Sequence, residues 1–201
     1  MISITKLAVG EYENNAYVVA CERTSRGVIV DAAAEAGRIL AACEEVVVES
    51  ILTTHGHLDH VQALDPVKDA LGIPWYLHLA DVDIAGRSPD EGLTDGQEIV
   101  VGEIALHVIH TPGHTPGSVS FVFEPSDDSE VHVLFSGDTL FPGGPGATRW
   151  DYSDFGQIMD SLEKGLFPLL PDDALVHPGH GNSTTIGAER PHLGEWRARG
   201  W

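Results

Sequence analysis

Three histidines and one aspartate fall within six consecutive positions, His55-Gly56-His57-Leu58-Asp59-His60. Imidazole nitrogens and carboxylate oxygens are common protein ligands of zinc, iron and manganese. The motif follows residues 46–54, a mostly apolar stretch that is typical of a buried strand. A turn at a strand end can fold alternate side chains toward one point, and Gly56 permits tight backbone geometry. The sequence therefore predicts that this segment holds metal.

Three later polar residues have a similar setting. His114, Asp138 and His180 each follow an apolar, strand-like stretch and lie in Gly-rich turns. Any one of them alone is more typical of a turn than of a ligand. Taken together they indicate one site, because loops at the same edge of a sheet cluster in α/β proteins.

Strand-like and helix-like stretches alternate along both halves of the chain. Alternation with period two or with helical spacing predicts strands at 2–8, 16–22, 27–31, 46–54, 97–101, 104–110, 118–123, 131–136 and 174–177, with helices at 31–43, 61–71, 155–166 and 188–199. Pro66 predicts that the second helix starts late or bends. The acidic stretch 124–130 is expected to be a loop. The pattern favours one α/β domain over residues 1–201, with sheet at the centre and helices outside.

Composition excludes several classes of protein. The net charge is −20, from 11 basic and 31 acidic residues, so the surface repels nucleic acid and anionic membranes. No stretch has the roughly 20 apolar residues of a membrane helix, and the first residues do not resemble a signal peptide. Cys21 and Cys43 are expected to be buried free thiols, with a disulfide as the alternative. We expect a cytoplasmic protein that acts on a small molecule; its oligomeric state is not indicated.

The order of these motifs resembles the metallo-β-lactamase superfamily. His-x-His-x-Asp-His, an isolated His, Gly-Asp-Thr-Leu and Gly-His follow one another between residues 55 and 180, and the resemblance covers the chain from about residue 2 to about residue 180. The segments Thr53-Thr54-His55, Thr111-Pro112-Gly113-His114 and Ser136-Gly137-Asp138-Thr139-Leu140-Phe141 are most similar to glyoxalase II-like hydrolases. The fold implied is an αββα sandwich of two mixed sheets flanked by helices.

The resemblance also implies two adjacent divalent metal ions, zinc first, with iron or manganese as alternatives. His55, His57 and His114 would hold the first ion. Asp59, His60 and His180 would hold the second, and Asp138 would bridge both. Asp31 would orient a ligating histidine, although a helix cap is an equally good interpretation of that residue. His110 and His177, close to ligands in the sequence, are weaker candidates for similar outer contacts.

The activity implied is hydrolysis of a thioester, or of another ester or a lactone, by a metal-activated hydroxide, with Asp59 also accepting a hydrogen bond from the nucleophile. The alternative is a mononuclear-iron persulfide dioxygenase, which would use His55, His114 and Asp138. Two features of the sequence depart from the glyoxalase II pattern. The C-terminal helical domain of glyoxalase II is expected to be missing, since 21 residues follow His180, and the family's Gly-Cys-Gly-Lys/Arg loop is replaced by a segment that ends in Arg149-Trp150.

Overall fold

The computed structural model describes residues 1–126 and 131–200. Its first mixed sheet has the strand order β1-β2-β3-β4-β5-β6. Strands β1 to β3 pair antiparallel, and β3 to β6 pair parallel. The strands are β1 (Ile2–Val9), β2 (Asn14–Cys21), β3 (Arg26–Val30), β4 (Val47–Leu52), β5 (Trp75–His78) and β6 (Glu91–Leu93).

The second sheet has the order β14-β13-β10-β9-β8-β7, with one parallel pairing, between β10 and β13. Its strands are β7 (Glu98–Val101), β8 (Ile104–His110), β9 (Val119–Phe123), β10 (Val133–Gly137), β13 (Leu175–Pro178) and β14 (Thr184–Thr185). A short ribbon of β11 (Leu140–Phe141) and β12 (Gly144–Pro145) follows β10.

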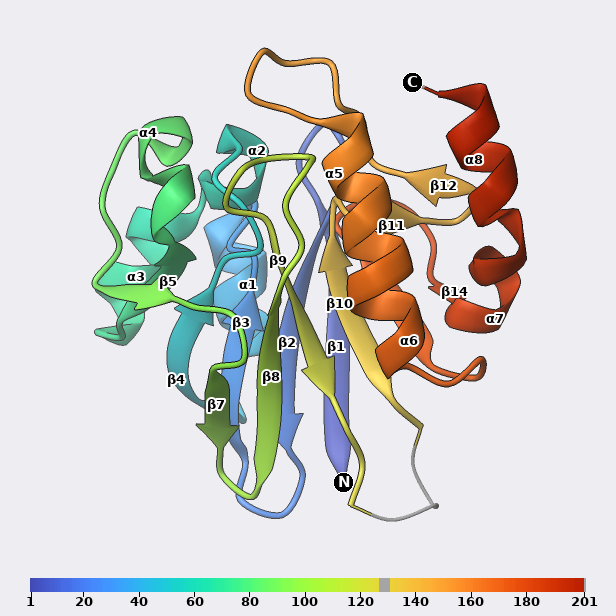
Figure 1. The fold of residues 1–201 in the computed structure, drawn as a ribbon. Helices are drawn as coiled ribbons and strands as arrows, with labels where there is room; N and C mark the ends of the chain where they lie inside the picture. Colours follow the sequence, from blue (N-terminus) through green and yellow to red (C-terminus); the bar gives the residue numbers. More distant parts are fainter. Residues whose placement is uncertain (127–130, 201) are drawn as a thin grey trace.

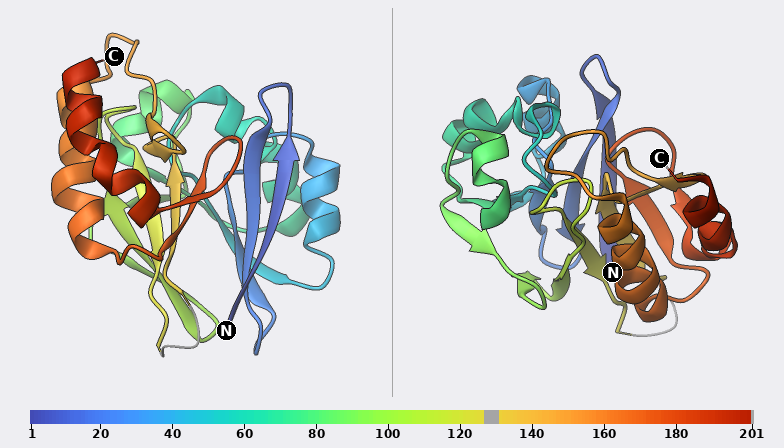
Figure 2. Two further views of the ribbon diagram at one scale, coloured as in Figure 1. Left: turned by 90° about the vertical axis from the view of Figure 1, so that its right-hand side faces the viewer. Right: turned by 45° about the horizontal axis from the view of Figure 1, so that its top comes forward.

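Helices cover the outer face of each sheet. On the first sheet these are α1 (Ala36–Ala42), α2 (Leu58–Val61), α3 (Leu64–Leu71) and α4 (Val82–Ala85). On the second they are α5 (Phe155–Asp160), a π-helical turn (Ser161–Leu166), α6 (Phe167–Leu169), α7 (Ile186–Glu189) and α8 (Leu193–Arg199). The two sheets stand face to face between these helical layers (Figures 1 and 2).

Strand alternation produces the four layers. In β2, Tyr17 and Val19 join a buried cluster between the sheets, whereas Val18 joins the cluster under α1 and α3. In β9, Phe121 points into the cluster between the sheets and Val122 into the cluster under α5. Because neighbouring residues of a strand point to opposite faces, strands buried on both sides read as continuous apolar runs. The αββα sandwich predicted from the sequence is confirmed.

Several boundaries differ from the predictions. The first helix begins at Ala36 instead of residue 31, because the Asp31 backbone is left-handed (φ 59°) and Glu35 is a second left-handed residue (φ 53°). The last helix is divided into α7, a 3-10 turn at Arg190–His192 that contains Pro191, and α8. The late helix start near Pro66 is confirmed, because α3 begins at Leu64.

The short strands β5 and β6 were not predicted. The predicted loop at 124–130 lies partly outside the described residues, since 127–130 are not described. Cys21 and Cys43 are buried and free, as expected. Among the described residues, no helix is both long and apolar enough to cross a membrane.

Candidate metal centre

All seven predicted ligands lie at one edge of the two sheets, each just after a strand. His55 follows β4, and His57 to His60 lead into and form α2. The second sheet contributes the remaining three from the loops after β8, β10 and β13, namely His114, Asp138 and His180. The α2 segment and the loop between β8 and β9 lie beside one another at the top of Figure 1. Segments far apart in sequence thus meet where the sheets face each other.

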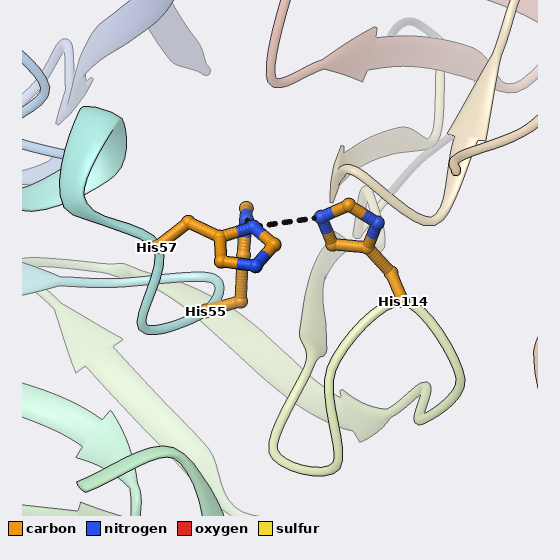
Figure 3. A group of neighbouring side chains, drawn as sticks. All are labelled: His55, His57 and His114. Carbon is orange, nitrogen blue, oxygen red and sulfur yellow. Dashed lines mark hydrogen bonds between the residues drawn. The ribbon is translucent and has the colours of Figure 1, made fainter. Parts of the chain in front are cut away.

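The first ligand group contains three imidazoles. His57 Nδ1 lies 3.0 Å from His55 Nε2 and 3.0 Å from His114 Nε2. Figure 3 shows these rings converging from two loops on opposite sides of the site. Metal–nitrogen bonds of about 2.0–2.1 Å in a tetrahedral site put two ligand nitrogens roughly 3.3 Å apart. The observed spacing fits three ligands of one ion.

The second group contains Asp59, His60 and His180. His180 Nε2 lies 3.4 Å from Asp59 Oδ2, and His60 Nε2 lies 4.0 Å from the same oxygen. Asp138 stands between the two groups. Its Oδ2 is 3.5 Å from His114 Nε2 and 3.6 Å from His180 Nε2, and its Oδ1 is 3.5 Å from His60 Nε2. This is the placement that a bridging carboxylate requires.

The outer nitrogens of the histidines are engaged, so their inner nitrogens are available to a metal. His114 Nδ1–H donates to the Ala147 carbonyl (2.7 Å), and His180 Nδ1–H donates to the Tyr12 carbonyl (2.9 Å). A carbonyl only accepts, so in the neutral ring of each histidine Nε2 carries the lone pair that a metal needs. His60 Nε2 and Asp138 Oδ1 are buried without a hydrogen-bond partner. Such orphaned buried atoms need an explanation, and a bound cation supplies one; the residues present fit the two ions that the sequence implies.

Asp31 fixes ligands of both groups. Its Oδ2 accepts from His60 Nδ1 and from Thr54 Oγ1, each at 2.8 Å. Since the Thr54 hydroxyl donates to Asp31, it accepts from His55 Nδ1 at 3.1 Å. Asp31 therefore orients His60 directly and His55 through Thr54, which is the orienting role described for carboxylates behind ligand histidines. The helix-cap alternative is wrong, because α1 begins five residues later.

Electrostatics separate the two groups. Burial and the neighbouring imidazoles hold the pKa of His55 well below its ordinary value, and burial with His114 lowers the pKa of His57 to about 4. Burial also lowers the pKa of His114. Burial alone would lower the pKa of His60, but the Asp31 and Asp138 carboxylates outweigh it and raise that pKa to about 9.

The pKa values of Asp59 and His180 shift in opposite directions. Burial is the largest single effect on each group and opposes both shifts, but it is outweighed by their mutual hydrogen bond together with the charges and hydrogen bonds of neighbouring groups. The pKa of Asp59 is therefore held well below its usual range, and that of His180 is raised. The second group is therefore an ion-paired set of acids and bases, whereas the first is a set of neutral imidazoles.

Sequence reasoning missed several supporting residues. Asn14 Nδ2 donates to Asp59 Oδ2 at 3.0 Å, and the Tyr152 hydroxyl lies 2.8 Å from His57 Nε2. The Trp150 ring packs on His57 with centroids 4.5 Å apart. None of these residues stands in a motif, because each acts on a ligand more than 40 positions away. The rings of His110 and His177, the two weaker candidates, hydrogen-bond to the Pro116 carbonyl and to Ser183 Oγ instead of to a predicted ligand.

A cavity of about 1020 Å³ opens above the metal ligands. Its walls combine apolar side chains with two arginines that approach from different segments. The described residues that line it include Tyr12, Leu58, Phe141, Trp150, Arg149 and Arg199. The Arg149 guanidinium lies over the Trp150 ring, 4.9 Å from its centroid. A cavity of this size encloses a small organic molecule.

The fold and the set of converging histidines and aspartates define a class of αββα proteins that bind metal ions at the edge of the two sheets. The family model of the metallo-beta-lactamase superfamily matches residues 9–180, and the chain belongs to that superfamily. A relative from Haemophilus influenzae, named hydroxyacylglutathione hydrolase GloC, is 32% identical over 81% of this chain and 83% of its own. A hydroxyacylglutathione hydrolase from Rhodospirillum rubrum is 35% identical over 84% of this chain and 62% of its own.

Solved structures agree with this assignment. The B3 metallo-beta-lactamase BLEG-1 superposes with a TM-score of 0.82 at 33% identity, covering 95% of this chain and 98% of its own. ETHE1 from Myxococcus xanthus gives 0.81 at 28% identity, covering 95% and 83%. TTHA1623 in a di-iron-bound form gives 0.77 at 32% identity, covering 92% and 96%.

Proposed function

We propose that this protein is a dinuclear metal-dependent hydrolase of small thioesters. The observation that carries the proposal is the convergence of seven ligands in two groups that share Asp138. Each group takes ligands from both sheets. The donor set of five imidazoles and two carboxylates suits first-row divalent ions, with zinc preferred and iron or manganese as alternatives.

The bound ions would supply a hydroxide nucleophile near neutral pH and would stabilise the charge that develops on the carbonyl oxygen. Asp59 is placed for a second task. Its Oδ2 already accepts from Asn14, and its side chain is 27% exposed toward the cavity. A carboxylate with spare lone pairs can accept a hydrogen bond from the attacking water and so orient it.

The chemistry of the leaving group favours thioesters over amides or alkyl esters. A thiolate leaves without a general acid because thiols are far more acidic than amines or alcohols, and Asp59, with its lowered pKa, is an unsuitable acid. The cavity also presents Arg149 and Arg199 in a chain of net charge −20. Arginines bind carboxylates with paired hydrogen bonds. The charge of the cavity therefore favours a thioester that carries a carboxylate, as the hydroxyacylglutathione named for two relatives does.

The test combines metal content with turnover. Protein purified without added metal is analysed for elements and then assayed for thiol release from a panel of thioesters, with esters and lactones alongside. We expect close to two metal ions per chain and release of thiol. His57→Ala should abolish it, whereas His192→Ala, which alters an exposed histidine outside the centre, should leave it unchanged. One iron per chain, together with oxygen consumption when a persulfide is added, would contradict this proposal and support the persulfide dioxygenase instead.

A further inference from the structure

Asp81 is a completely buried aspartate that belongs to neither ligand group. It ends a 3-10 turn (Leu79–Asp81) after β5. Its Oδ2 accepts from the Gly56 backbone N–H at 2.7 Å and from Thr115 Oγ1 at 2.6 Å. Its Oδ1 accepts from the Gly117 N–H at 2.6 Å. All three donors lie in the two loops that carry the first ligand group.

The donors flank the ligands closely. Gly56 stands between His55 and His57, and Thr115 follows His114 directly. Asp81 therefore connects a loop of the first sheet to a loop of the second through one carboxyl group. Hydrogen bonds to a buried charged group are shorter and stronger than neutral ones, and a buried backbone N–H left without its acceptor is costly.

Both loops approach Asp81 too closely for a side chain. A Cβ added at Gly117 would lie 2.7 Å from the Asp81 carboxyl carbon, and one added at Gly56 would lie 2.7 Å from the Asp81 carbonyl oxygen. Glycine at these two positions lets the loops close onto the aspartate. The packing and the hydrogen bonds thus indicate the same function for this residue.

We propose that Asp81 is a positioning residue that holds His55, His57 and His114 at ligating distance across the two sheets. The inference rests on the proposed metal centre. It predicts a selective effect, because the second group is held by other contacts, from Asp31 to His60 and from the Tyr12 carbonyl to His180. Loss of Asp81 should weaken the first metal site and spare the second.

The decisive variant is Asp81→Asn, which keeps the shape of the side chain. One amide oxygen can serve Gly117 or the Gly56 and Thr115 pair, but not both, because the amide nitrogen is a donor. Zn²⁺ affinity is measured by competition with a chromophoric chelator in two backgrounds. His180→Ala removes a ligand of the second site, and His114→Ala removes a ligand of the first.

In the His180→Ala background, Asp81→Asn should lower Zn²⁺ affinity on the order of 10- to 100-fold, the usual loss for a residue that orients ligands. In the His114→Ala background it should change affinity less than about threefold. The visible spectrum of Co²⁺ bound to the first site should also change, since it reports ligand geometry. Equal effects in both backgrounds, or none in the first, would overturn the inference.

A matched control distinguishes the positioning role of Asp81 from a purely structural one. Leu64→Ala removes a buried side chain at the start of α3 and should lower the melting temperature without altering either Zn²⁺ affinity. If Asp81→Asn does not fold, Thr115→Val removes one of the three donors and should give a smaller loss at the same site. Wild-type protein that binds no metal would refute the proposed function itself; two bound ions unaffected by Asp81→Asn would refute the positioning role alone.

Discussion

The surroundings of each ligand histidine decide whether its ring is positively charged before a metal binds. His60 keeps Nδ1–H on Asp31, and two carboxylates raise its pKa to about 9, so it is protonated at neutral pH without metal. A metal that binds through Nε2 must displace the second proton of the charged ring, which is on Nε2. His57, with a pKa of about 4, is already neutral at pH 7, so a metal displaces no proton from it.

The two sites should therefore respond differently to pH. From pH 6.5 to 8.5, Zn²⁺ affinity of the second site should rise at least tenfold per pH unit, because binding releases the His60 proton throughout that window and the pKa of His180 is raised as well. Affinity of the first site should be nearly constant. The measurement is a Zn²⁺ competition titration at three pH values in His114→Ala, which retains the second site, and His180→Ala, which retains the first. Equal slopes would contradict the assignment of protons.

At the residue scale the sequence predicted the side chains that converge, but not the residues that support them. The seven predicted ligands stand in short motifs at strand ends, where residue type and local spacing carry the information. Asp81 acts on donors 25 and 36 positions away, and Asn14 acts on a carboxylate 45 positions away. A single polar residue with distant partners leaves no local pattern, so only the folded chain reveals it.

At the scale of elements, the long apolar strands were predictable because strands buried on both faces read as continuous runs. The short elements were not. β5 and β6 have four and three residues, too few to establish a period. The start of α1 was misplaced because Asp31 has the residue type of a helix cap, yet its carboxylate is used by Thr54 and His60. A local preference was overridden by contacts across the fold.

The segment 146–154 contacts the first ligand group. It holds His114 through the Ala147 carbonyl and through Ser153 Oγ, which donates to the His114 carbonyl at 2.8 Å. The same segment brings Arg149 and Trp150 to the cavity. We infer that one short loop both steadies a ligand and contacts the substrate.

Arg149→Ala should therefore raise KM for a carboxylate-bearing thioester by about tenfold, the loss expected for a hydrogen bond between charged groups. KM for a neutral thioester should change little, and kcat should be similar for both, because the metal ligands are untouched. Arg149→Gln is the control that keeps a polar, unbranched side chain without its charge. A similar KM increase for both substrates would indicate a packing role for Arg149 in place of carboxylate recognition.

At the scale of the molecule, each proposed site joins the two sheets. The first takes His55 and His57 from one half and His114 from the other; the second takes two residues of α2 and His180. Without metal, these segments are held by hydrogen bonds and by the apolar cluster between the sheets. With metal bound, each ion would link the two halves directly, and a metal that binds only the folded chain stabilises that chain.

Removing metal should therefore lower the melting temperature. Free metal at 100 times its Kd stabilises by about 2.7 kcal/mol per site, which for a domain of this size corresponds to roughly 5–10 °C. The measurement is thermal unfolding with and without a chelator, followed by addition of excess Zn²⁺, which should restore the higher value. The double variant His114→Ala/His180→Ala, which lacks one ligand of each site, should show a much smaller shift. An unchanged melting temperature in chelated wild-type protein would mean that metal does not join the halves, and that the apolar cluster alone holds this edge together.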